Sequence, residues 1–149
     1  MDLKSIKMTH SDIWKKGKEV EKYVGALVRE HVSAEEMKCG GDFLVGPGRH
    51  IVLEIKSAEV MNGSGAGRLH SKFGKFYVDA SAHKLLSGAG YKNWYALALT
   101  YKSMVILLRF VPASKLEVSG TYASLSNLYS GFAAPLEQFI EKVKQDEDF

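Results

Sequence analysis

The sequence has one cysteine, three prolines and no long apolar run, and each shortage excludes a class of protein. A single cysteine, Cys39, excludes an internal disulfide framework and offers no metal-binding spacing, so we expect it to be a small buried residue. No stretch approaches the roughly 20 apolar residues of a membrane span, and residues 1–12 lack a signal-peptide core. We therefore expect a cytoplasmic protein in a reducing compartment.

The composition is that of an ordinary globular protein. At 149 residues, with 46% hydrophobic and 25% charged residues, the chain is long enough to bury a sizeable core. No internal repeat, low-complexity tract or linker divides it. We expect one domain over residues 1–149, with a core at about 11–111 and a C-terminal extension and helix at 112–149.

The net charge is only +3, but it is unevenly distributed. Residues 49–92 hold seven Lys or Arg against three acids, whereas residues 137–149 hold five acids against two lysines. A basic middle region suits an anionic partner, although a solvated surface is the ordinary explanation of such a charge run. The acidic end is expected to be a solvated helix with a frayed tail.

Hydrophobic periodicity predicts a mixed α/β sandwich in the order helix, three strands, helix, two strands, helix. The expected helices are 11–31, 80–86 and 135–144. The expected strands are 37–39, 42–45, 50–57, 94–101 and 104–111, with 75–78 extended as well. Residues 62–67 are expected to be a flexible loop, and the chain after Pro112 is expected to be irregular until the last helix.

The strand at 50–57 carries two charges where a buried strand should have none. Alternate residues of a strand share a face, so Ile51, Leu53 and Ile55 should enter the core. The opposite face then carries His50, Val52, Glu54 and Lys56. Charged side chains are rarely buried unless they are paired or bind a metal, so this face needs an explanation.

The turn before this strand decides where Asp42 lies. A four-residue turn would pair Asp42 with Leu53, on the core face. A three-residue turn, Gly46-Pro47-Gly48, would pair Val45 with Arg49 and Asp42 with Val52, so that Asp42 becomes the diagonal neighbour of Glu54. Because Gly48 suits the left-handed position of such a turn, we expect the three-residue turn.

Two converging carboxylates repel each other unless one takes up a proton or a cation holds both. Carboxylate oxygens without His or Cys suit Mg²⁺ or Mn²⁺, and such an ion stabilises charge on a phosphate. Lys56 on the same face could orient a water or neutralise the transition state. The pattern is that of a phosphodiesterase, and the alternative is a Glu–Lys pair on a half-exposed edge strand.

Gly41-Asp42, eleven further residues and then Glu54-Ile55-Lys56 resemble the signature of the PD-(D/E)xK nuclease superfamily. The segment KGKEVE at residues 16–21 resembles the KGxxxE segment of archaeal Holliday junction resolvases and their relatives. The resemblance covers about residues 14–111, with Gly41 in place of the name-giving proline. It implies a restriction-endonuclease-like αβββαβ core with a central mixed sheet flanked by helices.

The same resemblance implies roles for individual residues. Asp42 and Glu54 would be metal ligands, helped by the carbonyl of Ile55, and Lys56 would be the catalytic lysine. Glu21 would be the acid on the first helix. The implied protein is a Mg²⁺- or Mn²⁺-dependent DNA endonuclease, and its likeness to the resolvases implies a structure-specific substrate such as a Holliday junction. A restriction- or repair-type nuclease and a catalytically idle nucleic-acid-binding module are the alternatives.

Further residues are candidates for DNA contact. Glu21 lies on the apolar side of its helix near Gly17, which would leave room for backbone or metal water, and the alternative for Glu21 is an ordinary boundary acid. His83 falls on the second helix, where relatives carry Gln or His, and the alternative is a surface histidine. The loop NGSGAGR lacks the Lys-Ser/Thr of a phosphate-binding loop, but it could fold over a DNA backbone or sit in solvent. The expected DNA-contacting residues are Lys16, Arg68, His70, Lys72, Lys75 and His83.

Aromatic and apolar residues give two last expectations. Tyr91, Trp94, Tyr95 and Phe110 are expected in the core or an interface and not in base stacking. Residues 120–140 hold more apolar side chains than a connecting segment needs, which predicts a homodimer through this region. These residues are Tyr122, Leu125, Leu128, Tyr129 and Phe132.

Overall fold

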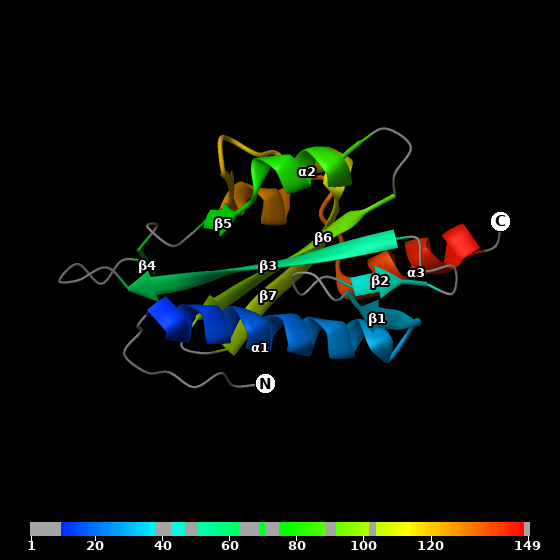
Figure 1. The fold of residues 1–149 in the computed structure, drawn as a ribbon, viewed down its shortest axis with the longest axis horizontal. Helices are drawn as coiled ribbons and strands as arrows, with labels where there is room; N and C mark the ends of the chain where they lie inside the picture. Colours follow the sequence, from blue (N-terminus) through cyan, green and yellow to red (C-terminus); the bar gives the residue numbers. More distant parts are fainter. Residues whose placement is uncertain are drawn as a thin grey trace.

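The computed structural model describes residues 10–37, 43–46, 51–62, 69–70, 75–88, 92–101 and 104–147. Its helices are α1 (His10–Arg29), α2 (Ala80–Leu86) and α3 (Leu136–Glu147), with short 3₁₀ helices η2 (Ala113–Lys115) and η3 (Leu125–Tyr129). Its strands are β1 (Ala34–Glu36), β2 (Phe43–Val45), β3 (Ile51–Asn62), β4 (Leu69–His70), β5 (Lys75–Tyr77), β6 (Trp94–Tyr101), β7 (Met104–Pro112) and β8 (Tyr122–Ser124). The chain is a mixed α/β protein (Figure 1).

The central sheet has the strand order β1-β2-β3-β6-β7, and β4 pairs with the far end of β3. Strands β3 and β6 are parallel, whereas the other pairs of this sheet are antiparallel. The parallel pair follows from the connection, because α2 lies between the two strands in the chain and returns it to the same end of the sheet. Strands β5 and β8 form a separate two-stranded ribbon.

The sheet separates two layers. Figure 1 shows α1 on one side of the sheet and α2 on the other. Residues from α1 and α3 join the core on the first side, while β5, β8 and η3 cover the second. Strand β6 is buried from both sides, which explains its almost unbroken apolar run from Trp94 to Leu99.

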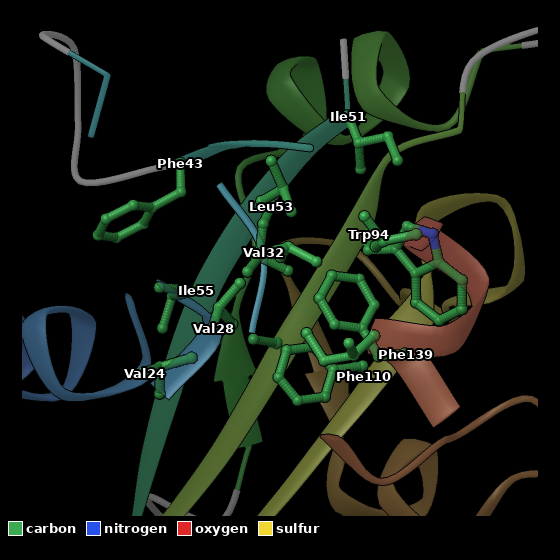
Figure 2. Close-up of a cluster of buried hydrophobic side chains, with 14 of the residues drawn as sticks. Val24, Val28, Val32, Phe43, Ile51, Leu53, Ile55, Trp94, Phe110 and Phe139 are labelled. Atoms are coloured by element: carbon green, nitrogen blue, oxygen red, sulfur yellow. The ribbon is translucent and has the colours of Figure 1, made fainter. Parts of the chain in front are cut away.

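An aromatic group closes the core on the α3 side (Figure 2). The rings of Phe110 and Phe139 are stacked with centroids 4.3 Å apart, and Trp94 meets Phe139 edge-on at 5.1 Å. Phe139 is fully buried, so its truncation to alanine should cost about 3–5 kcal/mol of stability. This packing fixes α3, the predicted C-terminal helix, against the sheet.

Helix α1 meets the sheet where Phe43 of β2 packs against Gly25. A Cβ atom at position 25 would overlap the Phe43 ring, so only glycine permits this approach. The arginine side chain of Arg29 also lies over the same ring, 5.7 Å from its centroid. The contact holds the start of β2 beneath the helix.

Asn93 joins β3, α2 and the end of β7. Its side chain accepts a hydrogen bond from the Val52 backbone N–H at 3.0 Å and donates one to the carbonyl of Leu86 at 3.1 Å. Its own carbonyl accepts from the Ala113 N–H at 2.9 Å. Asn93 is buried, so these bonds satisfy polar groups that would otherwise be unpaired.

The order of helices and strands expected for the main elements is confirmed, and α2, β6 and β7 begin and end within a residue of their predicted bounds. Three details of the prediction are wrong. The first strand lies at 34–36 and not at 37–39, and β3 continues to Asn62 because it pairs with β4. The chain after Pro112 is not irregular, since β8 pairs with the distant β5.

The longest helix, α1, has 20 residues, and like the other helices of the described segments it is not apolar enough to span a membrane.

Candidate functional site

Strand β3 presents its residues as the alternation predicts. Ile51, Leu53 and Ile55 are buried in the core on the α1 side. Glu54 and Lys56 lie half-buried on the opposite face, the side that α2 covers. The two charges therefore share the face on which Ala58, two residues further on, enters the second core cluster.

Glu54 and Lys56 form an ion pair. The Lys56 Nζ atom lies 3.0 Å from Oε1 of Glu54, and the side chains are 24% and 13% exposed, respectively. Removing two charges from water to this extent costs free energy that their attraction only partly returns. A catalytic pair and an ordinary ion pair would both place the two side chains in contact, but β3 is not the edge strand that the second expectation assumed, because it lies between β2 and β6.

Glu21 brings a third charge to the same region from α1. It is half-buried next to the buried Val20 and Val24, which agrees with the half-buried position of a boundary acid, the alternative considered for it. Desolvation raises its pKa above the ordinary value of 4.5, although Lys18, with Nζ 3.5 Å from its carboxylate, opposes this shift. Lys56 and Glu54 also act on the Glu21 pKa, the first lowering and the second raising it, but each has a smaller effect than burial and Lys18.

Helix α1 contacts β3, the strand that carries Glu54 and Lys56. Within the described residues, β2 pairs with β3 from Ile51 to Leu53, just before Glu54.

Gly17 lies one turn before Glu21 on α1, at a position where no close packing contact involves it among the described residues. A Cβ atom there would meet nothing within 4 Å in the part of the chain that is described. Packing against those residues therefore does not require glycine at this position.

Tyr95 and His83 lie beside Glu54. Tyr95 of β6 is the parallel partner of Glu54 and is almost fully buried. Its hydroxyl oxygen lies 2.9 Å from Nδ1 of His83, which α2 positions above the strand. Burial lowers the pKa of His83, so the imidazole is neutral at pH 7. Of the two DNA-contact candidates whose side chains the structure describes, Lys75 and His83, it is His83 that lies next to the charged face of β3.

The sequence reading missed the polar function of Tyr95. Tyr95 and the neighbouring Trp94 and Phe110 are buried, as expected, but the Tyr95 hydroxyl is also the partner of the His83 ring. A tyrosine in place of phenylalanine within a buried strand was the available signal, because a buried hydroxyl needs a hydrogen-bond partner.

The hairpin register differs from the expected one. Val45 pairs with Ile51, Leu44 with Val52 and Phe43 with Leu53, so the expected three-residue turn and the Val45–Arg49 pair are wrong. The side chains of β2 and β3 nevertheless lie on the faces of the sheet that were expected, because a register shift of two residues returns every side chain to the same face. Gly46, with φ 91°, takes a left-handed conformation, and its N–H donates to the carbonyl of Ser33 at 2.7 Å. Thus β1 as well as the turn sets this register.

Several predicted residues lie outside the described part of the chain. Asp42, Cys39, His50, Arg68, Lys72 and Tyr91 belong to segments that are not described, as do the side chains of Lys16 and His70. Lys75 is described: it is exposed on β5, with its Nζ 4.3 Å from the centroid of the Tyr122 ring. It belongs to the β5–β8 ribbon and not to the Glu54–Lys56 face.

The oxygen donors at this site are the carboxylates of Glu54 and Glu21 and the main-chain carbonyls of β3. The side chain of Ile55 is buried in the core, so only its carbonyl could be a ligand. Within the described segments, no three His, Cys, Asp or Glu side chains gather closely enough to hold a metal ion. Carboxylate and carbonyl oxygens are the kinds of donor that Mg²⁺ takes from a protein, alongside several waters.

The apolar residues expected at a dimer interface do not behave alike. Leu128 is buried within the chain, and Leu125 packs partly against the same core cluster, so these two residues are not available to a partner. Tyr122, Tyr129 and Phe132 are exposed. The prediction was wrong for the leucines because η3 turns them inward beneath β8.

Comparison of the chain with protein-family models, curated proteins and solved structures finds no match.

Proposed function

We propose that this chain is a divalent-metal-dependent endonuclease that hydrolyses phosphodiester bonds in DNA. The observation that carries the proposal is the group of Glu54, Lys56 and Glu21. Glu54 and Lys56 form an ion pair on β3, and burial raises the pKa of Glu21 on α1, the helix that contacts this strand. Perturbed carboxyl groups of this kind are enriched at sites that do chemistry.

The topology supports a restriction-endonuclease-like fold of the PD-(D/E)xK type. The elements α1, β1, β2, β3, α2 and β6 follow one another in the αβββαβ order that the sequence resemblance implies, with the two short strands β4 and β5 inserted between β3 and α2. The charged pair lies on the third of these strands and the helix-borne acid on the first helix, which are the elements expected to carry them.

Asp42 completes the proposed site. It directly precedes Phe43 in the chain, and Phe43 pairs with Leu53, the residue before Glu54. Asp42 and Glu54 are therefore each adjacent in the chain to a paired residue, Phe43 and Leu53 respectively, and consecutive Cα atoms are about 3.8 Å apart. We assign Asp42, Glu54 and the Ile55 carbonyl as the groups that would hold Mg²⁺ or Mn²⁺.

The bound ion would activate a water and stabilise the charge that develops on the phosphate. Lys56 would donate hydrogen bonds to the attacking water and to a non-bridging phosphate oxygen, and its charge would offset the charge of the transition state. A carboxylate with a raised pKa is a stronger base than usual, so Glu21 would accept the proton of that water.

His83 would contact the DNA phosphate. If the Tyr95 hydroxyl donates to Nδ1, the neutral ring carries its proton on Nε2, which is then a donor free of a positive charge. Tyr95 would thus fix both the tautomer and the direction of the ring. In this account Tyr95 is a positioning residue and does not touch the substrate.

The direct Glu54–Lys56 contact favours a second candidate, a nucleic-acid-binding module without catalysis. At 3.0 Å the lysine neutralises the carboxylate by itself, as a purely structural pair would. The two candidates differ in one respect, since only the nuclease needs a divalent ion.

Labelled duplex, single-stranded and four-way-junction DNA, incubated with Mg²⁺, Mn²⁺ or a chelator, would test the proposal and identify the substrate. Cleavage of any of these with metal and none with chelator is the expected result. Binding without cleavage under every condition would favour the idle module.

A further inference from the structure

The ribbon of β5 and β8 has one buried and one exposed face. Its register pairs Lys75 with Ser124, Phe76 with Ala123 and Tyr77 with Tyr122. Phe76 and Ala123 are fully buried in the second core cluster. Because side chains alternate along a strand, the four remaining residues, Lys75, Tyr77, Tyr122 and Ser124, all face outward.

The outward face is aromatic and positively charged. Tyr77 is 66% exposed and Tyr122 is 39% exposed, and they sit directly opposite each other on the two strands. The Lys75 ammonium lies 4.3 Å from the centroid of the Tyr122 ring. Phe76 and Ala123 already fill the core beneath, so neither tyrosine is needed to cover it.

The ribbon is held rigidly although each strand has only three residues. The Val78 N–H donates to the Thr121 carbonyl at 2.8 Å, which continues the pairing beyond Tyr77. Behind β8, the buried side chain of Asn127 binds both backbone groups of Glu117 and the carbonyl of Ser124 at 2.9–3.0 Å. The two tyrosines are therefore presented on a preorganised surface.

The ribbon adjoins the strand that carries the candidate site. Strand β5 contacts β3, and Phe76 shares a core cluster with Ala58 (Figure 1). Ala58 is two residues beyond Lys56 on the same face, which is about 7 Å along a strand. A polymer that crosses the Glu54–Lys56 face can extend onto the ribbon.

We propose that the outward face of the β5–β8 ribbon binds unpaired nucleotides of the DNA substrate, with bases stacked on Tyr77 and Tyr122 and Lys75 in contact with a phosphate. Exposed aromatic rings accept any base by its flat face, and a neighbouring cation matches the charged backbone. A duplex hides those base faces, so the ribbon favours single-stranded segments, flaps or branch points. The inference rests on the proposed function only in taking the substrate to be DNA.

The test measures binding without cleavage. Fluorescence anisotropy of a labelled oligothymidine, in the presence of a chelator and in a Glu54→Gln background, reports binding by the whole chain without cleavage, so the contribution of the ribbon is read from its variants. Tyr77→Leu and Tyr122→Leu should each weaken binding about fivefold or more, because stacking on the ring is lost. Tyr77→Phe and Tyr122→Phe keep the ring and should leave the affinity unchanged. Lys75→Gln should reduce the slope of log K against log salt by about 0.7.

Tyr129→Leu is the matched control, since Tyr129 is 75% exposed but lies on η3, outside the ribbon. It should bind oligothymidine like the parent. An equal loss of affinity in Tyr129→Leu, or no loss in either ribbon variant, would overturn the proposal. So would light scattering in which Tyr77→Leu or Tyr122→Leu abolishes self-association while oligothymidine binding persists, because the face would then meet a second copy of the chain.

The two proposals fail in different ways. Metal-dependent cleavage with tyrosine-independent binding would overturn the ribbon and leave the nuclease intact. Tyrosine-dependent binding of oligothymidine without cleavage of any DNA would leave the ribbon intact and overturn the nuclease.

Discussion

The Tyr95 hydroxyl lies 2.9 Å from Nδ1 of His83, within hydrogen-bonding distance, and this contact joins β6 to α2 directly beside Glu54. Neither residue is charged at pH 7, so the contact can orient the imidazole without adding a charge to the site. Replacing Tyr95 therefore tests the positioning role without removing a charge.

Tyr95→Phe should keep the packing of β6 and remove only the hydroxyl. Burial lowers the pKa of His83, and a hydroxyl that donates to Nδ1, as proposed above, would favour the neutral ring as well, so its loss should move this pKa upward. The cost in stability should be about 0.5–1.5 kcal/mol. An NMR titration of the His83 ring measures the shift, and a pKa that stays the same or falls would show that the hydroxyl does not hold the ring.

Glu21→Gln should raise the melting temperature at neutral pH. The pKa of Glu21 is raised above 4.5 in the folded state, so the folded protein binds this proton more tightly than the unfolded chain. The stability that this proton contributes is fully present below pH 4.5 and is lost as the pH rises through the folded pKa. The gain from glutamine should therefore be largest above the folded pKa and shrink toward pH 4.5. A gain that grew on acidification would contradict the raised pKa.

Gly25→Ala and Gly17→Ala form a matched pair within α1. Alanine is the better helix former by about 1 kcal/mol, so propensity alone favours both changes. A Cβ at Gly25 would overlap the Phe43 ring, whereas at Gly17 it would meet nothing within 4 Å among the described residues. Gly25→Ala should thus destabilise by about 1–3 kcal/mol through overpacking, while Gly17→Ala should stabilise. Urea unfolding of both variants gives the signs, and equal effects would disprove the close approach.

Self-association decides whether the protein could resolve a four-way junction. Such a junction offers two phosphodiesters related by a two-fold axis, so resolution by one site per chain requires a homodimer. Tyr129 and Phe132 are exposed and remain candidates for that interface. Light scattering with and without junction DNA should report a dimer, and a monomer under both conditions would exclude symmetric resolution while leaving a nicking or repair activity possible.

The sequence was sufficient to predict which face of β3 each residue occupies. A period of two sends Leu53 and Ile55 one way and Glu54 and Lys56 the other, whatever the turn before the strand. The turn itself was not predictable from local preference. Gly46 bonds to Ser33 and Phe43 rests on Gly25, so the register depends on β1 and α1, which lie far from the turn in sequence.

The structural features that could not be predicted from the sequence are those whose interacting residues lie far apart in the chain. Strand β8 has three residues and pairs with β5, about 47 positions earlier, so it leaves little local signal. The same is true of the Tyr95–His83 contact, whose partners lie on a strand and on a helix. Periodicity could suggest Glu21 as a border residue, but the nearness of its charge to Glu54 and Lys56 follows from the packing of α1 on β3.

The central claim is that Glu54 and Lys56 hydrolyse DNA with the help of a divalent ion. The most direct measurement is cleavage of labelled DNA by purified parent, Glu54→Gln and Lys56→Ala proteins in Mg²⁺, with thermal melting and DNA binding measured in parallel. Glu54→Gln should bind DNA but not cut it, and Lys56→Ala should remain folded and cut about a hundredfold or more slowly. Undiminished cutting by both folded variants would contradict the account.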